Sequence, residues 1–193
     1  MPPILSQGMI SYRPAMIFID GGYLREGFKK VIKREIGENA DDFNNLQNHI
    51  RNQLVYGSIV GELRRTYYYD AIVDHTDPKY ADQRTFFDKL QKNSFYEVKL
   101  GRCIKANGGY RQKGIDILIA IDMLTKAYQN HYDTAAFLGG DDDFIDLIES
   151  VKEFAGKRVY GFYFEHNVSQ RLLNTFDMRM DLDYNFPKWF KSD

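Results

Sequence analysis

The hydrophobic residues of this chain fall into short unbroken runs, separated by longer segments with helical periodicity. The clearest run, at residues 15–19, is apolar throughout and stops at Asp20-Gly21-Gly22. An unalternated run bounded by glycine is typical of a strand that is buried on both faces of a parallel sheet. This pattern, together with β-branched and aromatic content, predicts strands at residues 15–19, 66–72, 95–104, 134–138 and 158–164.

Helices are predicted between these strands, because apolar residues recur there every three or four positions. The predicted helices span residues 23–34, 42–56, 79–92, 114–128, 143–154 and 169–176. Ser169 is suited to cap the last of them, and Gly156 to end the one before it. Asn107-Gly108-Gly109 is a turn signal at a hairpin tip before Lys113. Strands that alternate with helices predict an α/β fold, a three-layer α/β/α sandwich around a central, mainly parallel sheet.

Composition narrows the class of protein. The 193 residues suit one domain with a sizeable core, predicted over residues 15–193 after an N-terminal arm at residues 1–14. A hydrophobic content of 44% excludes wholesale disorder. Lys and Arg total 26 against 27 Asp and Glu, so the chain does not bind nucleic acid in a histone-like basic mode.

Cysteine usage and hydropathy predict a cytoplasmic protein. Cys103 is the one cysteine, so it forms no internal disulfide, and with four scattered histidines it offers no zinc motif. No stretch approaches the roughly 20 apolar residues that span a bilayer. The N-terminus lacks the charged start and the long apolar run of a signal peptide. We therefore expect no membrane association.

Aspartates follow two of the predicted strands. Asp20 comes directly after residues 15–19, and Asp141-Asp142-Asp143 follow the strand at 134–138 and a pair of glycines. Ligands of open parallel sheets bind beyond the carboxyl ends of the strands, so these carboxylates should converge if both strands are central. Asp116, in the first turn of the helix at 114–128, adds a third acid at this edge.

Two neighbouring acids are weaker candidates for the same site. Asp122 lies six residues after Asp116, and at about 100° per residue the two side chains point in opposed directions. In an extended turn, side-chain alternation would direct Asp141 and Asp143 one way and Asp142 the other. Asp20, Asp116, Asp141 and Asp143 are therefore the leading candidates.

Carboxylates at close range repel one another unless they are protonated or bind a cation. With oxygen ligands only, the natural cations are Mg²⁺ and Mn²⁺, which polarise a phosphoryl oxygen and activate water. Phosphodiester hydrolysis follows from this chemistry. A phosphatase or a nucleotide-binding domain is also compatible with the residues, and helix capping alone explains many single aspartates.

Three stretches resemble the motifs of NYN-domain proteins, particularly of the LabA-like branch. They are Ile17-Phe18-Ile19-Asp20-Gly21-Gly22-Tyr23-Leu24, Lys113-Gly114-Ile115-Asp116 followed by Asp122, and Phe137-Leu138-Gly139-Gly140-Asp141-Asp142-Asp143-Phe144. Residues 156–159 and Ser169 with Leu172 also fit. The three motifs occur in order, and the resemblance covers residues 15–183.

The resemblance implies a PIN-like α/β/α fold and a nuclease centre that uses Mg²⁺ or Mn²⁺. It implies catalytic and metal-binding roles for Asp20, Asp116, Asp141 and Asp143, and a supporting metal-binding role for Asp122. Tyr23 stands where many members have asparagine, and Gly139 where many have serine. These departures leave the acids intact and bear on substrate preference.

Cations close to the acids are candidates for binding phosphates. Lys113 lies three residues before Asp116, and the remaining candidates flank the predicted turn or the last predicted cap: Arg102, Lys105, Arg111, Ser169 and Arg171. Each could equally be a solvated surface residue. Tyr67, Tyr68 and Tyr69 could stack on bases, but their position inside a strand favours core packing.

The loop after the second predicted strand carries Asp74, His75 and Asp77. It is either an element of the site's rim or an ordinary polar loop.

The sequence thus predicts a metal-dependent nuclease that hydrolyses phosphodiester bonds, with single-stranded or structured RNA as the expected partner in preference to DNA. Two alternatives stay open. One is a regulatory module that keeps the acidic pocket and binds RNA or protein, and the other is a small-molecule phosphatase. The near-neutral net charge of −1 is compatible with a homodimer.

Overall fold

The computed structural model describes residues 13–54, 61–106 and 109–190. The predicted N-terminal arm lies outside the described residues as far as position 12, and Arg13 and Pro14 already belong to the first strand. The last two residues of the helix predicted at 42–56 and most of the predicted hairpin tip at 107–109 also lie outside the described residues.

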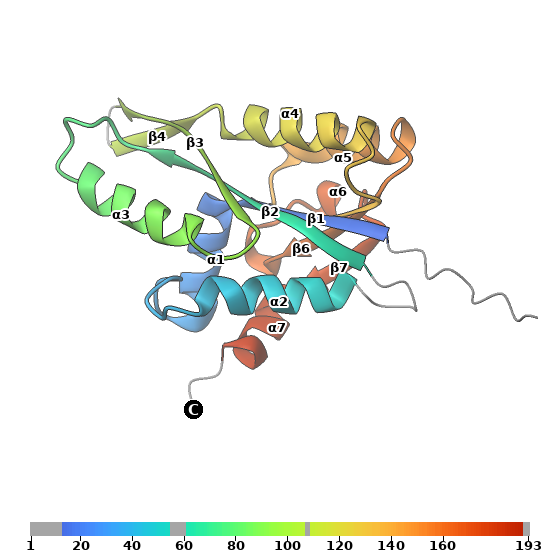
Figure 1. The fold of residues 1–193 in the computed structure, drawn as a ribbon, viewed down its shortest axis with the longest axis horizontal. Helices are drawn as coiled ribbons and strands as arrows, with labels where there is room; N and C mark the ends of the chain where they lie inside the picture. Colours follow the sequence, from blue (N-terminus) through green and yellow to red (C-terminus); the bar gives the residue numbers. More distant parts are fainter. Residues whose placement is uncertain (1–12, 55–60, 107–108, 191–193) are drawn as a thin grey trace, which may run out of the picture.

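A central sheet organises the described structure (Figure 1), with seven strands in the order β4-β3-β2-β1-β5-β6-β7. The strands are β1 (Arg13–Asp20), β2 (Gly61–Ile72), β3 (Tyr96–Ala106), β4 (Gly109–Lys113), β5 (Thr134–Leu138), β6 (Arg158–Tyr163) and β7 (Met178–Asp181). Neighbouring strands are parallel except β3 and β4, which pair antiparallel. The predicted mainly parallel sheet is therefore confirmed.

Helices cover both faces of this sheet (Figure 1). One face carries α1 (Gly21–Ile32), α2 (Asp42–Leu54), α3 (Tyr80–Gln91) and α7 (Leu182–Trp189), and the other carries α4 (Ile115–Tyr128), α5 (Ile145–Glu153) and the short α6 (Gln170–Leu173). Residues of β1 alternate between the two cores. Ile17 and Ile19 pack on the first face and Phe18 on the second, and all three are fully buried. Burial on both faces is why this strand is apolar without alternation.

β1 lies where the winding of the sheet reverses. From β1 the chain adds β2, β3 and β4 on one side, and then returns across the sheet to add β5, β6 and β7 on the other. β1 and β5 are parallel neighbours, with Ile19 opposite Leu138. In open α/β sheets a ligand crevice forms beyond the carboxyl ends of the strands at such a reversal. The fold therefore directs the ends of β1 and β5 to the expected binding edge.

The C-terminal segment differs most from the predicted elements. α6 ends at Leu173 rather than at residue 176, and β7 and α7 are not among the predictions. β7 has only four residues, and Pro187 inside α7 is a helix-breaking signal. α7 forms because it buries Phe186 against Phe28 and Phe164, a tertiary gain that outweighs local propensity.

The three consecutive tyrosines of β2 belong to the core, as predicted. Tyr67, Tyr68 and Tyr69 have exposed fractions of 6%, 0% and 0%. They are therefore not available to stack on bases. Within the described residues, no helix is both long and apolar enough to cross a membrane.

α1 approaches β6 so closely that only glycine fits at position 27. A Cβ atom at Gly27 would overlap the ring of Phe164, which is fully buried. We predict that Gly27→Ala lowers the free energy of unfolding by about 1–3 kcal/mol despite the better helix propensity of alanine, because the core must move to accept the methyl group. Urea denaturation followed by circular dichroism measures the change. Lys30→Ala, on the exposed side of α1, is the control and should stay within about 0.5 kcal/mol of wild type. An unchanged or raised midpoint for Gly27→Ala would contradict the tight contact.

Candidate active site

The first acid of the site is fixed by the junction of β1 and α1. Asp20 is the last residue of β1 and the N-cap of α1, and its carboxylate accepts a hydrogen bond from the backbone N–H of Tyr23 at 3.1 Å. α1 begins at the next residue, Gly21, where a Cβ atom would come within 2.7 Å of the Asp70 carboxylate. Glycine therefore allows the helix to begin directly at the strand end, which holds Asp20 in place.

The second group of acids follows β5 through two glycines. A Cβ atom at Gly140 would overlap the backbone of Asn167 and the ring of Tyr23. The chain then enters a single 3₁₀ turn, Asp142–Phe144, and Asp141 caps it by accepting a hydrogen bond from the Asp143 N–H at 3.1 Å. The loop is thus drawn against α1, so that Asp141 lies at the same edge of the sheet as Asp20.

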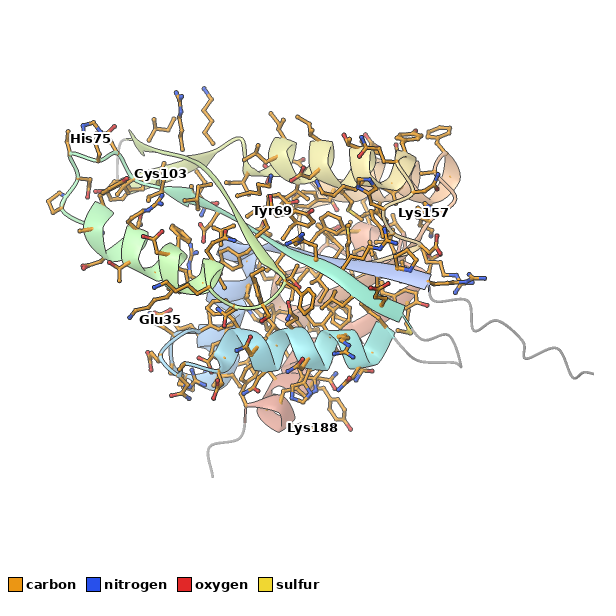
Figure 2. All side chains as sticks on the ribbon, viewed as in Figure 1. Glu35, Tyr69, His75, Cys103, Lys157 and Lys188 are labelled. Atoms are coloured by element: carbon orange, nitrogen blue, oxygen red, sulfur yellow. The ribbon has the colours of Figure 1, made fainter. Side chains whose placement is uncertain are left out.

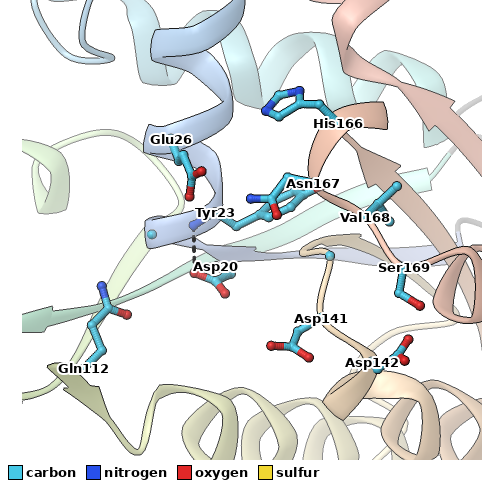
Figure 3. Close-up of a pocket in the computed structure, with 12 residues that line it drawn as sticks. Asp20, Tyr23, Glu26, Gln112, Asp141, Asp142, His166, Asn167, Val168 and Ser169 are labelled. Carbon is cyan, nitrogen blue, oxygen red and sulfur yellow. Dashed lines mark hydrogen bonds between the residues drawn. The ribbon is translucent and has the colours of Figure 1, made fainter.

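A cavity of about 650 Å³ opens between these two junctions (Figure 3). Figure 3 shows the carboxylates of Asp20 and Asp141 directed into the same space. The remaining lining side chains come from α1, β4, the 3₁₀ turn and the segment before α6: Tyr23, Glu26, Gln112, Asp142, His166, Asn167, Val168 and Ser169. Two acids from neighbouring strands thus face one polar cavity.

The four leading acids influence one another electrostatically. The pKa of Asp20 is raised from its ordinary 3.8 to about 6, mainly by burial and also by the charge of Asp116, although the hydrogen bond from Tyr23 acts to lower it. Burial also raises the pKa of Asp116, and the charges of Asp141 and Asp143 add to this effect. Asp116 and Asp143 do not line the cavity. Asp116 nevertheless acts on Asp20, and Asp141 and Asp143 act on Asp116, so the four carboxylates form one electrostatic group.

This group fits a hard divalent cation by its donor chemistry. Its ligands are carboxylate oxygens, which Mg²⁺ and Mn²⁺ prefer, and a cation would relieve the repulsion that raises the pKa of Asp20 and Asp116. Within the described residues, no three Asp, Glu, His or Cys side chains already sit at metal-binding separation. Binding would therefore require the carboxylates to turn toward the ion.

A model of the NYN domain matches residues 14–183. The chain belongs to the NYN domain family. This family lies within the PIN-like nuclease superfamily, and the resemblance noted in the sequence is confirmed at the level of the family. The LabA-like branch stays a prediction.

A solved structure of similar fold illustrates the likeness. A protein of unknown function from Vibrio parahaemolyticus matches at a TM-score of 0.66 with 20% sequence identity, over 89% of this chain and 93% of that chain. At this identity the likeness concerns the fold alone. No curated protein matches the chain.

Asp122, the supporting metal ligand implied by the NYN motif, does not line the cavity. Its carboxylate accepts a hydrogen bond from the Tyr69 hydroxyl at 3.0 Å and pairs with Lys126 at 2.6 Å. Both contacts lie on the α4 side of the sheet. Asp122 follows Asp116 by six residues on this helix. The arrangement agrees with the helical geometry that separates the two side chains by sequence.

Asp142 does not behave as the alternation of an extended turn predicts. It lines the cavity, and one of its carboxylate oxygens accepts a hydrogen bond from Arg171 at 3.3 Å. The other oxygen is buried and has no hydrogen-bond partner among the described residues. The reason is the 3₁₀ turn, which begins at this residue and replaces the two-residue alternation of a strand.

The predicted phosphate-binding residues lie in different parts of the structure, and only some of them are close to the acidic cavity. Ser169 lines the cavity and caps α6, and Arg171 lies beside it with its side chain 78% exposed. Lys113 is exposed and ends β4 just before α4, while Arg102 lines a different cavity. The side chains of Lys105 and Arg111 lie outside the described residues, although their backbones pair within the β3–β4 hairpin.

The sequence analysis missed several residues that line the cavity. Glu26 follows Gly22 by one helical turn on α1, a spacing that a helical wheel could have revealed. His166 and Gln112 reach the cavity only through the tertiary fold. Tyr23, at the position where many NYN members have asparagine, has a structural role. Its hydroxyl accepts a hydrogen bond from the Phe164 N–H at 2.8 Å, and burial raises its pKa.

Just behind the cavity, a buried polar network supports the start of α1. Asp70 of β2 is fully buried, forms an ion pair with Arg25 and accepts hydrogen bonds from Tyr68 at 3.2 Å and from Gln112 at 3.4 Å. Arg25 also lowers the pKa of Asp20 through its charge. The pairing with Asp70 keeps this guanidinium beside the acids and out of the cavity lining.

The raised pKa of Asp20 predicts a stability cost in the metal-free protein. Because its folded pKa of about 6 exceeds the unfolded value near 3.8, the folded state binds more protons between these values, and stability falls as pH rises through this window. Asp20→Asn removes the charge and keeps a good N-cap. We expect it to raise the free energy of unfolding by about 1–2 kcal/mol at pH 7.5 in chelating buffer, and to have little effect at pH 4.

Denaturant titration of both proteins at each pH measures this difference. Asp146→Asn, at an exposed position in the first turn of α5, is the matched control and should be neutral at both pH values. Equal stability of wild type and Asp20→Asn at pH 7.5 would show that ionised Asp20 carries no folding cost.

Proposed function

We propose that this NYN-domain protein is a metal-dependent nuclease that hydrolyses phosphodiester bonds through an aspartate-bound Mg²⁺ or Mn²⁺ centre. The observation that carries the proposal is the pair Asp20 and Asp141, which face one cavity from the ends of neighbouring parallel strands. The electrostatic coupling of these acids to Asp116 and Asp143 supports a site that is made to hold positive charge.

Asp20 and Asp141 would hold the principal ion, and Asp116 and Asp143 would hold a second ion or orient the attacking water. When bound, Mg²⁺ or Mn²⁺ would polarise a phosphoryl oxygen and make water a better nucleophile. The hydrolysis itself adds the water oxygen to phosphorus and breaks one bond from phosphorus to a sugar oxygen. One water proton goes to that leaving oxygen and the other to solvent.

The substrate backbone would be held by residues on either side of the acids. The Ser169 hydroxyl lies in the cavity lining, and Arg171 and Lys113 are exposed close to the ends of α6 and β4. Such groups fix the position of a phosphate backbone without reading its sequence. Arg171 now pairs with Asp142, so it would exchange this carboxylate for a substrate phosphate.

RNA is proposed as the substrate in preference to DNA. This choice follows the family resemblance, and the assay therefore uses RNA and DNA strands of the same sequence.

The decisive experiment is cleavage of a labelled single-stranded RNA with Mn²⁺ or Mg²⁺, by wild type, Asp141→Asn and Asp146→Asn. Asp141→Asn should lose at least about 100-fold in rate, the scale of removing one group that stabilises charge in an active site. Asp146→Asn should cleave like wild type, because Asp146 is exposed on α5 and does not line the cavity. Chelator should stop cleavage, and added Mn²⁺ should restore it.

Equal cleavage by wild type and Asp141→Asn would contradict the proposed centre. Retention of RNA without cleavage, unaffected by chelator, would instead indicate the regulatory binding module. Release of phosphate from a monoester, with oligonucleotides left whole, would indicate a phosphatase.

A further inference from the structure

A second cavity, of about 700 Å³, lies at the carboxyl ends of β2 and β3. It is enclosed by the loop before α3 and by the β3–β4 hairpin, and its lining includes Ile72, Val73, Tyr80, Arg102, Ile104 and Tyr110. Figure 2 labels two further lining residues, His75 and Cys103, at the end of the molecule where α3 begins. The proposed chemistry of the four aspartates makes no use of this cavity.

β4 connects the two cavities. Gln112 lines the acidic cavity and Tyr110 lines the second one. The two residues are two positions apart on one strand, so their side chains lie on the same face with Cα atoms about 7 Å apart. A nucleic-acid strand with a phosphate over Asp20 and Asp141 would therefore bring a nearby nucleotide to the second cavity.

The second cavity combines charged groups of both signs with aromatic and aliphatic side chains. Asp74 and Asp77 both line it, and the Asp74 carboxylate accepts hydrogen bonds from the Thr76 N–H and hydroxyl at 3.0 and 2.8 Å. The aromatic and aliphatic part of the lining comes from Ile72, Val73, Tyr80, Ile104 and Tyr110, and its other polar members are His75, Thr76, Cys103 and Arg102. The planar guanidinium of Arg102 can stack on a ring or pair with a phosphate at the rim. A neutral planar group with polar edges fits this combination.

Tyr110 is held in a defined position and is still partly open to a ligand. Its hydroxyl donates a hydrogen bond to Asp77, which also accepts from the Lys79 N–H at 3.0 Å. The Lys79 ammonium lies 5.1 Å from the centre of the tyrosine ring. The residue remains 41% exposed. An exposed aromatic ring that is fixed before binding loses little conformational entropy when a base stacks on it.

We propose that the second cavity is a base-binding subsite, which takes one nucleobase of the substrate strand next to the phosphate that is cleaved. The base stacks on Tyr110, while Arg102 contacts the base or the adjoining phosphate. The proposal rests on the proposed nuclease function, which places the substrate strand over the acids. The strand would then run along the carboxyl edge of the sheet from Asp141 to Tyr110.

The test is binding of fluorescent single-stranded RNA, measured by anisotropy, to full-length proteins that all carry Asp141→Asn to prevent cleavage. Tyr110→Leu keeps an apolar strand residue and removes the ring, so it should weaken binding about tenfold, the scale of losing one base stack. Tyr110→Phe keeps the ring and should stay within about twofold of its parent. Tyr184→Leu removes a tyrosine that is 66% exposed on α7, and as the matched control it should not change affinity.

A second arm uses the parent protein and needs no change at Tyr110. An abasic nucleotide is moved one position at a time along the RNA, and one position should weaken binding about as much as Tyr110→Leu does. In Tyr110→Leu, the abasic nucleotide at that position should have no further effect.

Three results would overturn the subsite. The first is an RNA affinity of Tyr110→Leu equal to that of its parent. The second is an equal loss of affinity in Tyr110→Phe and Tyr110→Leu. The third is that the abasic nucleotide has the same effect at every position in the parent, which includes the case in which the parent binds no RNA. The nuclease proposal fails separately. Position-specific binding by the parent, with no cleavage by wild type in any metal, would remove the nuclease function and leave the subsite standing.

Discussion

The parallel pairing of β1 with β5 is the constraint on which the rest of the structure depends. The register aligns Ile19 with Leu138, so the residues that follow each strand emerge at the same edge of the sheet. Because β1 is also the strand at which the winding reverses, no crossing helix fills the space beyond its end. Asp20 and Asp141 are thereby placed on opposite sides of one cavity, although 121 positions separate them in the chain.

The close approach of α1 to the loop after β5 shapes the site, and it also makes the ionised form of Asp20 unfavourable. Gly21, Gly27 and Gly140 each stand where a side chain would overlap a neighbour, and Tyr23 joins α1 to the end of β6 through the Phe164 backbone. These walls bury much of Asp20, and this burial is the main cause of its raised pKa. The packing that makes the acids responsive to a cation is therefore also what makes them unfavourable without one.

The β3–β4 hairpin contributes side chains to both cavities at this edge. As the antiparallel pair in an otherwise parallel sheet, it returns the chain toward the acids, where Gln112 contacts Asp70 and lines the acidic cavity. The same strand presents Tyr110 beside the loop that precedes α3. Under the proposed function, chemistry and substrate contact would thus be carried by different parts of the sheet. The acids depend on the central strands, whereas the second cavity depends on the edge.

The sequence was sufficient to predict the strand–helix alternation, the acids at strand ends and the family, because unbroken apolar runs and the glycines after them are local features. It did not determine α7, whose Pro187 is a local stop signal that the burial of Phe186 overrides. Nor did it determine that Asp142 enters the cavity lining or that Asp122 turns to Tyr69 and Lys126. Those orientations, and the meeting of Gln112 and His166 at one cavity, arise from contacts between residues far apart in the chain. Only the tertiary structure decides them, because no local pattern encodes which distant side chain a residue will meet.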